Sequence, residues 1–84
     1  MSDASTSETP LRTRFQIRLD GKTVSIATVG QAYQFLSRNS IEWMQFRSLH
    51  DDAVHLLQRA ARNAMLTVQA TDAVRALFVS AKLL

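Results

Sequence analysis

The residues of this 84-residue chain best suited to metal or proton chemistry are two histidines and an aspartate: His50, Asp51 and His55. On a helix, positions five apart are separated by roughly 140°, so the two imidazoles would point in different directions. Asp51 and His55 lie one turn apart, but two ligands do not make a zinc site. The chain also has no cysteine and no HExxH spacing. We therefore expect no bound metal and interpret Asp51 and His55 as a solvated pair.

Motifs for nucleophilic catalysis and for phosphate-binding loops are missing from the sequence as well. It has no GxSxG motif and no cysteine nucleophile, and Gly21 and Gly30 stand apart instead of forming a glycine-rich loop. Serine, histidine and aspartate all occur, as expected in any chain of this size. The sequence thus predicts a non-enzymatic protein with no catalytic residue and no cofactor.

Three arginines near the N-terminus are the first candidates for binding an anion. Arg12, Arg14 and Arg18 share one parity along the sequence, opposite to that of Phe15 and Ile17. On a strand they would lie on the face opposite the apolar one, where they could contact phosphates. No aromatic residue interleaves with them, as a sheet that stacks bases would need. Two interpretations remain: the arginines solvate an open sheet face, or they bind a nucleic acid.

A second pair of arginines, Arg59 and Arg62, lies within residues 55–65, HLLQRAARNAM. At about 100° per residue they share the polar stripe of a helix, while Ala60 and Ala64 gather on the other side. We interpret these arginines first as the solvated side of a packed helix, still available to an anionic partner. The alanines are the more specific signal, because small side chains let another helix approach closely.

The three arginines near the N-terminus lie within or beside a stretch whose pattern is typical of a β-hairpin. Within residues 14–26, apolar and polar side chains alternate on either side of Asp20 and Gly21, a pair suited to a two-residue type I′ turn. This turn predicts the cross-strand pairs Leu19–Lys22, Arg18–Thr23, Ile17–Val24, Gln16–Ser25 and Phe15–Ile26. A slip of one residue would destroy the match of apolar with apolar residues.

Three helices are predicted after the hairpin. Thr28 and Gln31 have the spacing of a capping box, and the helix that they start should end near Arg38 and Asn39. The other two are expected from about Ser48 to about Leu66, and from an N-cap at Thr71 to the last residue. The expected fold class is α+β: an N-terminal two-stranded antiparallel β-hairpin followed by three α-helices, in the order β-β-α-α-α.

Composition divides the chain into a polar tail, residues 1–11, and a single α+β domain, residues 12–84. The tail is expected to be disordered, and its first ten residues lack the apolar region of a secretory signal. Residues 11–84 hold ten bases against five acids, which permits an anionic partner without requiring one. With no cysteine and no run of about 20 apolar residues, we expect a cytoplasmic protein that does not enter a membrane.

Four large apolar side chains form a candidate interaction surface. Trp43 and Phe46 lie between the first two predicted helices, and Leu83 and Leu84 end the last apolar stripe. Trp43 and Phe46 have an alternative role, closing the end of a small core. A two-stranded hairpin also leaves its edges unpaired. The sequence therefore predicts a homodimer, and contacts with a further protein partner of unknown identity.

The order of these elements, and the stretches TVGQAYQFL, LHDDAVHLLQRA and TDAVRALFVSAKLL, resemble a family of short proteins from rhizobia and related alphaproteobacteria. The family is known as domain of unknown function 982, and the resemblance covers roughly residues 14–84. Its last helix has the form Ala-Arg-x-x-Phe-x-x-Ala, which Val74, Arg75, Phe78 and Ala81 match here. The resemblance implies a bacterial protein with the family fold, but it implies no activity and no catalytic residue.

Two functions follow as expectations. The favoured one is a small non-enzymatic binding or regulatory module that acts through protein–protein contacts and self-association. The alternative is a nucleic-acid-binding protein that uses the arginine-bearing face of the hairpin.

Overall fold

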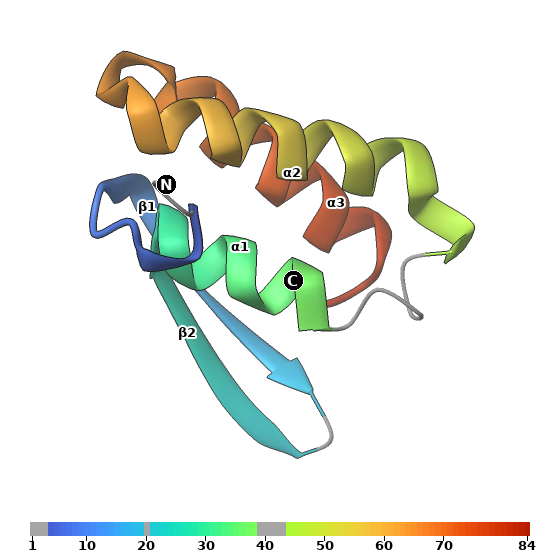
Figure 1. Cartoon of the computed structure of the whole chain (residues 1–84). Helices are drawn as coiled ribbons and strands as arrows, with labels where there is room; N and C mark the ends of the chain where they lie inside the picture. The colour runs from blue at the N-terminus through green and yellow to red at the C-terminus, as the bar shows by residue number, and fades with distance from the viewer. Residues whose placement is uncertain (1–3, 20, 39–43) are drawn as a thin grey trace.

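A β-hairpin followed by three α-helices makes up the computed structural model, which describes residues 4–19, 21–38 and 44–84 (Figure 1). The elements are a 3₁₀ turn η1 (Ala4–Thr6), β1 (Pro10–Leu19), β2 (Lys22–Thr28), α1 (Val29–Arg38), α2 (Arg47–Arg62), a 3₁₀ turn η3 (Ala64–Leu66) and α3 (Thr67–Ser80). The predicted α+β fold and its element order are confirmed. No helix in the described part of the chain is long and apolar enough to cross a membrane.

The register of the hairpin is the one that the sequence predicts. All five expected pairs form, from Leu19–Lys22 at the turn to Phe15–Ile26. Gly21 has a φ of 77°, a left-handed conformation that its missing Cβ permits and that a type I′ turn requires. Asp20, the other predicted turn residue, lies outside the described residues.

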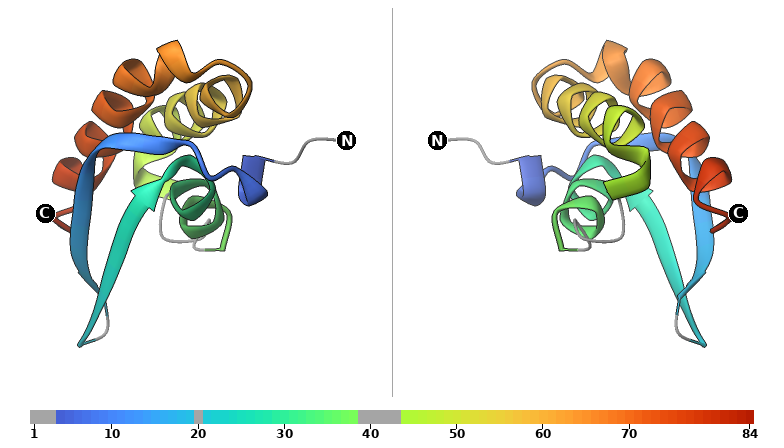
Figure 2. Two further views of the ribbon diagram at one scale, coloured as in Figure 1. Left: turned by 90° about the vertical axis from the view of Figure 1, so that its left-hand side faces the viewer. Right: turned by 90° about the vertical axis from the view of Figure 1, so that its right-hand side faces the viewer.

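At its N-terminal end β1 carries a bulge. Between the pairs Pro10–Thr28 and Phe15–Ile26, β1 advances five residues while β2 advances only two. The three extra residues bend β1 away from its partner strand and towards α3, as the two side views show (Figure 2). The bend brings the backbone N–H of Arg12 within 3.1 Å of the Thr71 hydroxyl on α3, to which it donates a hydrogen bond.

Residues 4–11 differ from the predicted disordered tail, because they pack against the start of α1. The first turn of a helix has unsatisfied N–H groups, and here Val29 donates to the Thr9 carbonyl at 2.9 Å and Gly30 to the Ser7 carbonyl at 3.0 Å. Leu11 is 8% exposed and belongs to the core. These contacts join residues that are far apart in the sequence, so no local pattern indicates them.

Helix α1 begins with the predicted capping box. The Gln31 N–H donates to the Thr28 hydroxyl at 3.1 Å, and the Gln31 side-chain oxygen accepts from the Ala27 N–H at 2.7 Å. Both bonds tie β2 directly to α1 with no loop between them. The helix extends to Arg38, as predicted.

The boundary between the last two helices differs from the prediction. Helix α2 ends at Arg62, because Asn63 takes an extended conformation and its side chain accepts a hydrogen bond from the Met65 N–H at 3.1 Å. After η3, helix α3 begins at Thr67, so Thr71 is not its N-cap but a residue within the helix that is 1% exposed.

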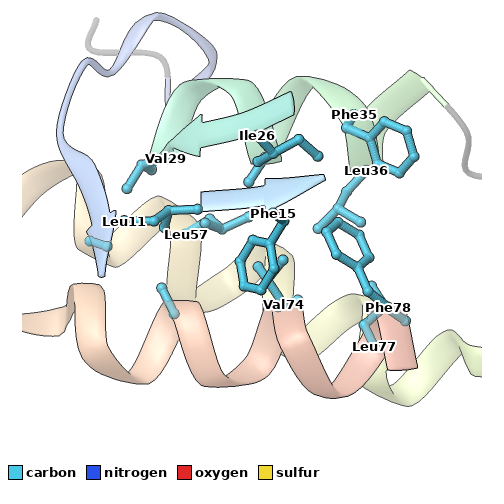
Figure 3. Close-up of a cluster of buried hydrophobic side chains, with 14 of the residues drawn as sticks. Leu11, Phe15, Ile26, Val29, Phe35, Leu36, Leu57, Val74, Leu77 and Phe78 are labelled. Atoms are coloured by element: carbon cyan, nitrogen blue, oxygen red, sulfur yellow. The ribbon is translucent and has the colours of Figure 1, made fainter. Parts of the chain in front are cut away.

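Phe78 occupies the centre of the core (Figure 3). Its ring meets Phe15 of β1 edge-on at 5.5 Å and Phe35 of α1 edge-on at 5.7 Å between centroids. Alanines let the helices approach, since Ala53, Ala60 and Ala70 have no exposed surface. Ala60 therefore has the predicted packing role, whereas Ala64 lies exposed in η3.

Candidate functional site

The outward side of the hairpin gathers three arginines on one uncovered surface. At the pairs Phe15–Ile26 and Ile17–Val24 the inward side chains are apolar, while the described outward side chains from the bulge to the turn are exposed, as are Arg12 and Arg14 within the bulge. We call the exposed set the arginine face; it consists of Arg12, Arg14, Gln16, Arg18, Thr23 and Ser25. The predicted alternation of buried and exposed residues is thus confirmed for β1, and no described helix covers this side (Figure 2).

Positive charge on the arginine face is uncompensated within the described residues. Arg18 pairs across the strands with Thr23, and Gln16 with Ser25, so small polar residues take the positions where acids could neutralise the arginines. The described residues of β1 and β2 include no acid, and none of the three arginines forms an ion pair with another described residue. Three cations on one strand without counter-charges among the described residues favour an anionic partner.

The strand that carries the arginine face is held by contacts with α3. Below it, Phe15 packs on Phe78, and the Arg75 guanidinium lies 5.9 Å above the Phe15 ring centroid, within the range of a cation–π contact. At the bulge, the Arg12 backbone is held by the Thr71 hydroxyl. The strand that carries the arginines is therefore anchored to the last helix, so its side chains can bind a partner without first ordering the backbone.

Aromatic side chains are missing from the arginine face. Phe15 is the aromatic residue of β1, and it points into the core with 3% exposure. A sheet that binds single strands stacks bases on exposed aromatic rings. The face can therefore contact a phosphate backbone through guanidinium groups, but it offers no surface for stacking unpaired bases.

Arg59 and Arg62 lie on a different surface from the hairpin arginines. They line an open cleft of about 450 Å³ between α2, α1 and η1, together with His55, Gln58 and Tyr33 among others. The Gln58 side-chain amide donates to the Tyr33 hydroxyl at 3.4 Å across this cleft. Both arginines belong to the last turn of α2, where the helix dipole already favours a cation, so their charge is partly balanced. The structure does not bring the five candidate arginines together.

The histidines have separate environments. One ring nitrogen of His50 lies 3.0 Å from the Leu36 carbonyl oxygen, and the other lies 3.7 Å from an Asp51 carboxylate oxygen. His55 is exposed at the cleft beside Arg59. Asp51 therefore lies next to His50 instead of forming the predicted pair with His55. No three side chains of histidine, aspartate or glutamate converge as metal ligands anywhere in residues 4–19, 21–38 and 44–84.

The four candidate interaction residues divide between core and surface. Phe46 and Leu83 are partly buried against the core, and Leu84 is 51% exposed, while Trp43 lies outside the described residues. Leu83 turns inward because Lys82, with a φ of 62°, ends α3 in a left-handed turn whose Leu83 N–H donates to the Phe78 carbonyl at 2.9 Å. Phe46 therefore packs at the edge of the core, the alternative role expected for it, and the interaction role of Phe46 and Leu83 stays a prediction.

Exposed apolar residues that the sequence interpretation missed lie around α3. Met65 is 84% exposed, Val68 45% and Val79 56%. Their helical spacing was the available signal, but it is visible only when α3 begins at Thr67. With the helix start placed at Thr71, Val68 fell outside the pattern.

No family model, no curated protein and no solved structure matches this chain.

Proposed function

We propose that this protein is a non-enzymatic binding module whose arginine face contacts the phosphates of duplex DNA. The observation that carries the proposal is the grouping of Arg12, Arg14 and Arg18 on one exposed, acid-free side of a protruding two-stranded ribbon. Cytoplasmic location, bacterial origin and the likeness to domain of unknown function 982 belong to the same proposal and rest on the sequence alone.

Dimensions support a duplex as the partner. The major groove of B-form DNA is about 12 Å wide and accepts a two-stranded β-ribbon. Arg14 and Arg18 are four residues apart on β1, which corresponds to about 13 Å along an extended strand. Their side chains therefore span a distance close to the groove width. The deep, narrow major groove of A-form RNA admits side chains poorly, and this favours DNA over double-stranded RNA.

The test is the salt dependence of binding to a short, fluorescently labelled, random-sequence DNA duplex, followed by anisotropy. We expect the binding constant to fall steeply with salt, and Arg14→Ala with Arg18→Ala to reduce the slope of log K against log salt by about 2. The control is Arg47→Ala with Arg59→Ala, which removes the same charge from positions on α2 away from the hairpin. Single-stranded DNA of the same length should bind more weakly, because the face has no exposed aromatic ring.

Three outcomes contradict the proposal. The first is no binding at low salt, and the second is an equal loss of slope in the control variant. The third is loss of binding in Arg59→Ala with Arg62→Ala but not in the hairpin variant, which would move the anion site to the α2 cleft.

The second candidate function is a protein-contact module that self-associates as a homodimer, and the observation that favours it is the exposed apolar surface of α3. Val68 and Val79 are about half exposed on a helix whose other side is fully buried. Large apolar side chains exposed on one helix are candidates for an interaction site. Size-exclusion chromatography with light scattering tests this candidate, and a strict monomer across the accessible concentration range would eliminate it.

A further inference from the structure

One side of α3 carries four residues whose spacing is the same in both directions along the helix, with an acid and a base at the two inner positions. Val68, Asp72, Arg75 and Val79 follow one another at steps of four, three and four residues. At about 100° per residue they fall within a sector about 60° wide. Phe78 and the other core residues of α3 lie on a different side of the helix. We call these four residues the α3 stripe; it lies along the exposed side of the helix, with Arg75 at the edge next to Phe15.

The α3 stripe is open to a partner. Its valines are 45% and 56% exposed, and the side chains of Asp72 and Arg75 are 66% and 50% exposed. Asp72 and Arg75 lie 3.6 Å apart, so the stripe has a charged centre of zero net charge between two apolar ends. Met65, in η3 directly before α3, is a further exposed apolar side chain.

We infer that the α3 stripe is the contact surface of a homodimer in which two copies of α3 pack antiparallel. A twofold axis that passes between Ala73 and Val74 lies midway along the helix between Val68 and Val79. It also lies midway between Asp72 and Arg75. It therefore places Val68 opposite Val79 of the second copy. The same axis places Asp72 opposite Arg75 of the second copy. This self-complementarity is what an isologous interface requires.

The charge pattern selects a second copy over an unrelated partner. Each copy presents one acid and one base in the order that its antiparallel neighbour needs, so both ion pairs form at once. The stripe spans about 16 Å, or three helical turns, and a contact of that length covers less surface than a standard protein interface. The dimer is therefore reversible and depends on concentration. The inference rests on self-association, the second candidate function, and is independent of DNA binding.

Sedimentation equilibrium over a concentration series tests the inference with charge-swapped variants. Wild-type protein should approach twice the 9.4-kDa chain mass at high concentration. Asp72→Arg and Arg75→Asp each place like charges opposite one another, and each alone should weaken dimerisation about tenfold or more. An equimolar mixture of the two restores both pairs and should dimerise again. Neither variant retains the intrachain Asp72–Arg75 pair, so the recovery can come only from contacts between copies.

The matched control is a mixture of Asp52→Arg and Arg47→Asp, which makes the same charge changes on exposed positions of α2. Each control variant should dimerise like wild type. A monomeric wild type would overturn both self-association and the α3 interface. A wild-type dimer unaffected by Asp72→Arg and Arg75→Asp would overturn the α3 interface alone. Failure of the mixture to recover, or new association specific to the control mixture, would refute the proposed charge pairing.

Discussion

Replacing Thr71 with valine tests how the arginine-bearing strand is held. The Thr71 side chain is 1% exposed, and its hydroxyl accepts the hydrogen bond of the Arg12 N–H at 3.1 Å. Valine keeps the shape and the β-branching of threonine, so packing and helix propensity change little. The Arg12 N–H loses its acceptor at a partly buried site.

A buried donor left without an acceptor costs about 1–3 kcal/mol. Because the Arg12–Thr71 bond is only partly buried and the new methyl group gains apolar contacts, we expect the lower part of this range, about 1–2 kcal/mol. A domain of this size has a free energy of unfolding of roughly 4–12 kcal/mol. The substitution should therefore lower Tm by about 4–16 °C.

Two measurements separate the lost hydrogen bond from a packing effect. Chemical denaturation of Thr71→Val gives the change in the free energy of unfolding, and amide hydrogen exchange gives the protection of the Arg12 N–H. Thr71→Ser is the matched control, since it removes a methyl group but keeps the hydroxyl, and it should leave Arg12 protected. An unchanged free energy of unfolding together with unchanged exchange at Arg12 would refute the reasoning.

Substitutions at three further positions test local features of the fold. Lys82→Gly should raise the free energy of unfolding by about 1 kcal/mol, because Lys82 has a φ of 62° that glycine adopts without strain. A lower free energy of unfolding in urea denaturation would contradict the left-handed turn. Gly21→Val should lower the free energy of unfolding by about 1–2 kcal/mol, because Gly21 has a φ of 77° that a β-branched residue adopts only with strain. Gly21→Asn should be nearly neutral, because asparagine tolerates this conformation. Equal Tm values for the two variants would contradict the turn geometry. Phe78→Ala should lower the free energy of unfolding by about 3–5 kcal/mol, because the ring is fully buried between Phe15 and Phe35. Thermal unfolding followed by circular dichroism should show Tm lowered by about 12 °C or more, and a Tm close to that of wild type would contradict the role of Phe78 in the core.

Elements specified by neighbouring residues could be predicted from the sequence. The hairpin register follows from alternation on both sides of Gly21, and the start of α1 follows from Thr28 and Gln31. In both cases the interacting residues are close in sequence, so a local pattern contains the whole interaction. The exposure of Arg14 and Arg18 follows from the same alternation.

Features that depend on distant residues could not be predicted. Asparagine and threonine are both residue types that favour helix N-caps, so Asn63 and Thr71 are both candidates in the sequence. The sequence alone does not show that the Thr71 hydroxyl accepts a hydrogen bond from the backbone of Arg12, 59 residues away. The order of residues 4–11 likewise depends on α1, through the bonds from Val29 and Gly30. Placing the start of α3 five residues too late also concealed the exposed stripe that begins at Val68.

The dependence of β1 on α3 has a consequence for biosynthesis. A ribosome releases β1 early, but the strand meets Thr71 and Phe78 only after the last helix has been translated. A two-stranded ribbon by itself is marginally stable in water. A nascent or truncated chain that stops before α3 therefore presents an unprotected strand to proteases and chaperones, and the hairpin is anchored only once α3 has been synthesised.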